Sequence, residues 1–268
     1  MRAFRLAYDG TNFRGFQRQP HGETIEDHLF DALRALDIDV SDGSPTGYAA
    51  AGRTDAGVSA RSQTVAFEQP EWLSPRALNS ELPASIRAWA VADVDPDFHA
   101  TYDAKERMYR YFLYAPDVDD RLAEDACRRL SGDHDFHNFT PDKTGTERDL
   151  SVSVERDGEF LTINCQAGGF ARQLVRRLVS IIESVVHGDR DPEFIDRALN
   201  EEPLSGPDGI APAAPEPLVL FQVRYPSATF SVDSDALESA HNIFESRRRT
   251  RLATARVAGV LLPDLEPS

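Results

Sequence analysis

Two stretches of alternating apolar and polar residues, at 150–155 and 160–166, flank the dipeptide Asp157-Gly158. Asp-Gly in this position is a strong signal for a β-hairpin, because the tight turn needs positive φ angles that these residues adopt at little cost. A hairpin joins antiparallel neighbours. The segment therefore favours an antiparallel sheet over a doubly wound sheet, in which helices connect parallel strands.

Strand-like and helical segments alternate along the rest of the chain. Strands are predicted at 3–8, 63–67, 86–94, 107–114 and 218–223. Helices are predicted from residue 25, after Thr24 and Asp27 as a weaker form of the capping box, and at 74–82, 121–130, 170–186, 192–200 and 234–248. This interleaving predicts an α+β fold, with an N-terminal α+β domain at 1–104 and a second at 105–226. Residues 227–268 form a C-terminal extension to which the sequence assigns no role.

The charge of the chain is strongly acidic, with 45 Asp and Glu against 29 Lys and Arg and a net charge of −16. Only Lys105 and Lys143 are lysines. Such a balance argues against nucleic acid as a partner, because phosphate binding depends on basic residues. Acid excess with few lysines is also typical of proteins from salt-saturated cytoplasm, where the Debye length is about 3 Å and net charge bears mainly on solubility.

The acidic residues avoid three windows, at 10–22, 43–67 and 160–182, which together hold one acid, Asp55. Burial alone excludes acids, so the windows can be core segments. The alternative is that they form an arginine-lined cleft for an anionic partner, surrounded by an outer surface adapted to salt.

Several classes of protein are disfavoured. No apolar run reaches about 18 residues, so no membrane-spanning helix is predicted, and the first residues form a strand pattern with no evident signal peptide. Cys127 and Cys165 form no CxxC motif, which disfavours a disulfide framework or zinc ribbon and favours a reduced, cytoplasmic setting. His134 and His137 lack a third ligand at metal-binding spacing, so no metal is expected.

The segment AAGRTDAGV at 50–58 is the strongest candidate for chemistry. Small residues leave room for a ligand beside Asp55, and Gly52 and Gly57 permit close approach or positive φ. Arg53 lies two residues away, so in an extended stretch both side chains leave on one face, and a nearby arginine favours the ionised carboxylate. Such a carboxylate is an acceptor or nucleophile. The alternative is a turn with a structural Asp–Arg pair.

Two further segments carry residues suited to nucleic-acid contact. Tyr109 and Tyr111 share one face of the strand at 107–114, where they are core residues or one of them stacks on a base. Arg172 and Arg176 fall on the side of the helix at 170–186 opposite its apolar arc, which suits phosphate or carboxylate recognition, or is a solvated face. The arginines at 247–249 are interpreted as a solvated helix end rather than an RNA-facing patch.

Five motifs, in this order along residues 3–225, resemble the TruA-type tRNA pseudouridine synthases. They are YDGTNFRGFQRQ at 8–19, AAGRTDAGVSARSQTVAFE at 50–68, LPASIRAW at 82–89 with FHATYDAKERMYRYFLY at 98–114, DFHNF at 135–139 and GGFARQLVRRLVSII at 168–182. The resemblance implies a pseudouridine synthase fold, in which two α+β domains share a mixed, largely antiparallel sheet with flanking helices. It also implies conversion of uridine to pseudouridine at nucleotides 38, 39 and 40 of the tRNA anticodon stem-loop, without metal or organic cofactor, by a homodimer.

By motif position, Asp55 resembles the catalytic aspartate, which attacks C6 of the base or C1′ of the ribose, or assists loss of the base as a glycal. Arg53 resembles the arginine that takes part in flipping the uridine, Tyr109 the tyrosine that packs on the target base, and Arg176 the basic residue that pairs with the aspartate. The remaining predicted substrate-binding residues are Arg14, Gln17 and Arg172. A catalytically inactive RNA-binding module is the alternative, although such a copy should lose at least one of these groups. A carboxylate-dependent hydrolase would need a second acid in the cleft.

Overall fold

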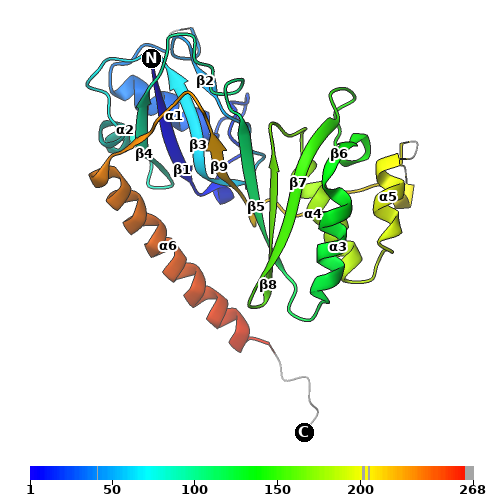
Figure 1. Cartoon of the computed structure of the whole chain (residues 1–268). Helices are drawn as coiled ribbons and strands as arrows, with labels where there is room; N and C mark the ends of the chain where they lie inside the picture. Colours follow the sequence, from blue (N-terminus) through cyan, green and yellow to red (C-terminus); the bar gives the residue numbers. More distant parts are fainter. Residues whose placement is uncertain (41, 201–202, 205, 263–268) are drawn as a thin grey trace.

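A single ten-stranded sheet runs through the computed structural model, which describes residues 1–40, 42–200, 203–204 and 206–262 (Figure 1). The strands follow the order β10-β4-β1-β3-β9-β5-β8-β7-β6, and β2 pairs with β3. Their bounds are β1 Arg2–Tyr8, β2 Ala49–Ala50, β3 Ser59–Phe67, β4 Ile86–Asp93, β5 Glu106–Tyr114, β6 Gly132–Asp135, β7 Glu147–Asp157, β8 Phe160–Ala167, β9 Leu218–Arg224 and β10 Ser231–Val232.

The centre of the sheet joins strands from distant parts of the sequence. β9 lies between β3, with which it pairs in parallel, and β5, with which it pairs antiparallel. The other strand pairs of the described chain are antiparallel. This confirms the predicted α+β class and the mixed, largely antiparallel sheet. The division of the chain at residues 104 and 105 stays a prediction.

The predicted hairpin is confirmed as β7 and β8. Their register pairs Asp157 with Phe160, so a two-residue connection joins the strands. Gly158 begins that connection with φ of +60°, a conformation that costs glycine little because it has no Cβ.

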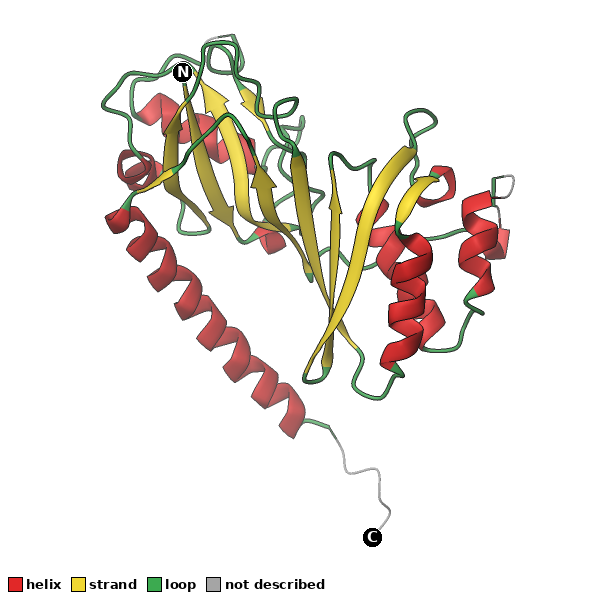
Figure 2. Ribbon diagram, viewed as in Figure 1, coloured by secondary structure: helices red, strands yellow, loops and turns green. Residues whose placement is uncertain are grey.

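The described residues form six α-helices around the sheet (Figure 2). They are α1 Ile25–Ala35, α2 Pro75–Glu81, α3 Asp120–Leu130, α4 Leu174–Val186, α5 Glu193–Asn200 and α6 Ser234–Val260. The capping box at α1 is complete, because Asp27 N donates to Thr24 Oγ1 at 3.2 Å and Thr24 N donates to Asp27 Oδ2 at 3.1 Å. Among the described residues, no helix has the length and apolar character needed to cross a membrane.

The predicted helix at 170–186 begins later than expected, at Leu174. Gln173 has φ of +60°, and the backbone of Arg172 is engaged by side chains from another loop. Thr140 Oγ1 donates to Arg172 O at 2.9 Å, and Arg172 N donates to Asp142 Oδ2 at 2.9 Å. The prediction that Arg172 and Arg176 share a helix face is therefore wrong, because Arg172 precedes the helix.

The C-terminal helix α6 is longer than predicted and extends away from the sheet at its distal end (Figure 1). The interpretation of the arginines at 247–249 as a solvated helix end is wrong for Arg247, which contacts the sheet domain through Asp9. Arg247 Nη1 and Arg251 Nη2 bond to Oδ2 of the buried Asp9 at 2.6 and 2.7 Å, so they fasten the middle of the helix to the end of β1. Arg248 and Arg249 pair with Glu245 on the same helix.

Candidate active site

A cavity of about 1830 Å³ opens where the loops at 14–19 and 50–58, the turn at 99–104, β5 and the start of α4 meet. This volume exceeds the range of about 300–1,000 Å³ typical of small-molecule sites. Six arginines line the cavity against three acids, a balance opposite to that of the whole chain. The arginines are Arg14, Arg18, Arg53, Arg107, Arg172 and Arg176, and the acids are Glu26, Asp55 and Asp142.

The centre of the site is an ion pair between the loop at 50–58 and α4. Arg176 Nη1 lies 3.1 Å from Asp55 Oδ2. The Asp55 side chain is 30% exposed and that of Arg176 14% exposed, so a ligand in the cavity can reach the carboxylate. Arg176 Nε also donates to Ala213 O at 2.7 Å, which fixes the direction of its guanidinium group. The geometry gives Asp55 a cationic partner by a charge-assisted hydrogen bond.

The backbone around Asp55 is held by buried side chains of the sheet. Gln63 Nε2 donates to Gly52 O at 2.6 Å, and Gly52 N donates back to Gln63 Oε1 at 3.3 Å. The hydroxyl groups of Tyr8 and Thr54 lie 2.8 Å apart, in hydrogen-bond contact. These contacts on both sides of Arg53 hold the backbone of the loop and so position the Asp55 carboxylate in the cavity.

Glycines allow neighbouring loops to approach this segment. Gly15 has φ of +101°, and a Cβ at that position would lie 3.1 Å from Thr54 O. Gly57 has φ of +83°, and a Cβ there would lie 2.8 Å from Pro215 Cγ. A side chain at either position would strain the backbone and displace the loop that carries Asp55.

Arg107 ties three segments of the cavity wall together. The side chain is buried, and its Nε donates to Ala51 O at 2.8 Å. Its Nη2 donates to Thr101 O at 2.6 Å, and its Nη1 donates to Gly168 O. One guanidinium group therefore sets the spacing between the loop at 50–58, the turn at 99–104 and the loop before α4.

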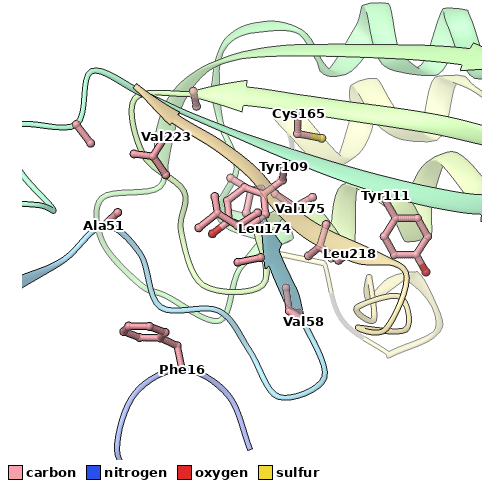
Figure 3. Packing of buried hydrophobic residues seen from close by; sticks show 14 of the residues in the cluster. Phe16, Ala51, Val58, Tyr109, Tyr111, Cys165, Leu174, Val175, Leu218 and Val223 are labelled. Carbon is pink, nitrogen blue, oxygen red and sulfur yellow. The ribbon is translucent and has the colours of Figure 1, made fainter. Parts of the chain in front are cut away.

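Tyr109 follows two residues later on the same face of β5 and is buried beneath the cavity. Its ring packs edge-on against Phe170 with a centroid distance of 5.0 Å, and it belongs to the same cluster of buried side chains as Leu174 and Val175 (Figure 3). Burial raises the pKa of Tyr109 to about 12, opposed by Arg107, so the phenol is neutral near pH 7. Gly52 faces the phenol, since a Cβ there would lie 3.6 Å from the hydroxyl oxygen.

The seven residues singled out from the sequence all line the cavity: Asp55, Arg53, Arg176, Tyr109, Arg14, Gln17 and Arg172. The pair of Asp55 and Arg176, which the motif resemblance implied, is present in the structure, whereas Arg53, the neighbour of Asp55 in the loop, is exposed. Arg172 and Arg14 pair with Asp142 and Glu23 at 3.4 and 3.2 Å.

Sequence reasoning missed Arg107, Gln63 and Tyr8. A signal for Arg107 was present, because the period of two along β5 places it on the same inward face as Tyr109 and Tyr111. An arginine on a buried strand face needs several acceptors, and here they are loop carbonyls. Gln63 gave no comparable signal, since its backbone-holding role depends on which loop lies beside β3.

The ion pair of Asp55 and Arg176 beside the buried Tyr109, in a cavity lined by six arginines, suits chemistry on a large anionic molecule. A family model for tRNA pseudouridine synthase matches residues 126–226. The tRNA pseudouridine synthase A of Natronomonas pharaonis is 65% identical over 98% of this chain and 99% of that protein. The enzyme of the same name from Haloarcula marismortui is 55% identical over 96% and 98%, and that from Methanosarcina acetivorans 42% identical over 83% and 84%.

The chain therefore belongs to the tRNA pseudouridine synthase family, and it is an isomerase that forms pseudouridine. Natronomonas and Haloarcula are halophiles, in agreement with the acidic composition. A chain of the solved Cbf5-Nop10-Gar1 complex aligns with 68% of this chain and 44% of its own length, at 13% identity and a TM-score of 0.35, which is too weak to add to the assignment.

Proposed function

We propose that this enzyme isomerises uridine at nucleotides 38, 39 and 40 of the tRNA anticodon stem-loop, with Asp55 as the nucleophile. The observation that carries the proposal is the fixed pair of Asp55 and Arg176 beside Tyr109. Attack at C6 of the base, attack at C1′ of the ribose and assisted loss of the base as a glycal all require a carboxylate at this position. Each route breaks the bond from N1 to C1′ and rejoins the base through C5, so no water or redox carrier is consumed.

The other cavity residues fit the steps around that chemistry. A uridine inside a helical stack must be flipped out, at a cost of a few kcal/mol that pocket contacts offset. Arg53 is exposed in the cavity and suits a role in holding the flipped conformation. Tyr109 is neutral, buried and among the residues that line the cavity, and we propose that the base packs against its ring.

The cavity wall supplies the affinity for the RNA backbone. Arg14, Gln17 and Arg172 lie on this wall and are proposed to contact phosphate and sugar groups. The net positive wall suits a polyanion even in a chain of charge −16. We further propose that the enzyme acts in the cytoplasm as a homodimer that holds one tRNA across both subunits, without a cofactor or metal. Light scattering in molar salt, with and without tRNA, tests the dimer.

Tritium release from tRNA carrying 5-³H-uridine tests the reaction, and mapping of pseudouridine in that tRNA tests the positions. Asp55→Asn keeps the size of the side chain but removes its charge, so we expect no release and near-normal tRNA binding. Asp31→Asn, at an exposed position of α1, is the matched control and should remain fully active. Normal tritium release by Asp55→Asn would show that Asp55 is not the nucleophile. A wild-type chain that binds tRNA without release would instead favour the alternative, an inactive RNA-binding module.

A further inference from the structure

The turn between β4 and β5 presents an aromatic side chain to the cavity that the catalytic proposal does not use. Tyr102 is 82% exposed, the highest value among the large hydrophobic side chains exposed in the described residues apart from Val260 near the end of α6. Trp72, Phe112, Tyr114 and Phe160 are also exposed, but these aromatic residues do not line the cavity, whereas Tyr102 does.

One face of the Tyr102 ring is already occupied. The imidazole of His99 stacks on it with a centroid distance of 4.3 Å and an interplanar angle of 29°. Nδ1 of His99 accepts hydrogen bonds from the backbone of Thr101 and Tyr102 at 3.2 and 3.4 Å, so the imidazole cannot rotate freely. The tyrosine therefore has a supported face and an open face.

The turn that carries this pair is anchored to the segment that carries Asp55. Thr101 Oγ1 donates to Ala50 O at 2.6 Å, and Arg107 Nη2 donates to Thr101 O at 2.6 Å. Within the turn, His99 N donates to Asp103 Oδ2 at 2.7 Å. Because the same guanidinium group also holds Ala51, the open face of Tyr102 stays at a fixed position relative to the catalytic loop.

We propose that Tyr102 is a stacking platform for an unpaired nucleobase of the tRNA that neighbours the flipped uridine. The inference rests on the proposed function above. Flipping removes a stacking partner from the adjacent base, and an aromatic ring of fixed orientation replaces it at little entropic cost. The arginine-rich wall favours RNA over other flat ligands, since it can neutralise the phosphates on either side of the stacked base.

Three substitutions at Tyr102 separate stacking from other contacts. Tyr102→Ala and Tyr102→Leu should each raise the Kd for tRNA roughly 10- to 100-fold, the range for loss of one base–aromatic stack. Tyr102→Phe keeps the ring and should change the Kd less than about threefold. The side chain is exposed, so the melting temperature should not change in any of them. Tyr114→Ala removes an exposed tyrosine outside the cavity and should bind tRNA normally.

A fluorescent base gives a direct readout. With 2-aminopurine placed at single loop positions of the tRNA, one position next to the target should be quenched by the wild type and by Tyr102→Phe, but not by Tyr102→Ala. Equal losses for Phe and Ala would show that the hydroxyl group makes the contact, and normal binding by Tyr102→Ala would show none; either result overturns the stacking platform. A wild-type enzyme that binds but does not isomerise tRNA would reject the proposed function, whatever the quenching.

Discussion

Arg176 Nη1 lies 3.1 Å from Asp55 Oδ2, although 121 residues separate them in the sequence. The pair joins the loop before β3 to the first turn of α4, so two distant segments must both be folded before the carboxylate has its partner. Arg176 cannot adjust freely, because Ala213 O accepts from its Nε. The site is therefore assembled by the tertiary fold, and the residues that hold it together can be tested separately.

Removal of Arg176, the cationic partner of Asp55, should impair catalysis more than tRNA binding. For Arg176→Gln we expect kcat to fall about 100-fold, because a partly buried carboxylate loses its charge-assisted hydrogen bond. Arg176→Lys should recover part of the activity, since an ammonium group restores the charge but not both contacts of the guanidinium group. Single-turnover rates and tRNA Kd values measure the two effects. Arg128→Gln, at an exposed position of α3, is the control, and an equal loss of kcat there would discredit the assignment.

Arg107 should affect stability as well as activity. Arg107→Met leaves three loop carbonyls without their donor, so we expect the free energy of unfolding to fall by about 3 kcal/mol. Activity should also fall, because the loops that carry Asp55 and Tyr102 lose their fixed spacing. Denaturant unfolding and tritium release measure these effects. Unchanged stability would mean that the three carbonyls find other donors.

The ion pairs of Asp9 with Arg247 and Arg251 predict that the attachment of α6 to the sheet weakens at low pH. Burial raises the pKa of Asp9, but hydrogen bonds from Thr11, Arg251 and Arg247 outweigh this and lower the pKa to about 2, from 3.8. A lowered folded-state pKa stabilises the protein above the unfolded value, so this contribution is present above about pH 4 and is lost between about pH 4 and pH 2.

Asp9→Asn should therefore reduce the free energy of unfolding by roughly 2 kcal/mol at pH 7, and the difference from wild type should disappear near pH 2. Urea unfolding across pH 2–7 measures it, and hydrogen exchange should locate the loss in α6. The exposed Asp31→Asn variant provides the comparison. A constant difference at all pH values would show that the ionised carboxylate is not the cause.

Much of the fold could be predicted, because the relevant interactions are local. The capping box at Thr24, the hairpin at Gly158 and the alternation along β5 depend on residues within a few positions of one another. The start of α4 could not be predicted, because Thr140 and Asp142 reach it from another loop. The apolar residues at 170–186 do include the buried face of α4. However, the side chains of Thr140 and Asp142 bind the backbone of Arg172, which therefore does not join the helix.

The sequence by itself indicated the seven predicted site residues that line the cavity, since the acid-poor windows and the motifs mark them without reference to any contact, but it did not indicate Arg107. Only the tertiary structure decided how these residues are held: Asp55 and Arg176, paired as the motif resemblance implied, meet at 3.1 Å, and Arg107 donates to carbonyls of three loops. The physical reason is the separation along the chain over which each kind of interaction acts. Backbone propensity and hydrophobic period act over a few residues, whereas an ion pair or buried hydrogen bond requires segments that only the packed sheet and helices bring together.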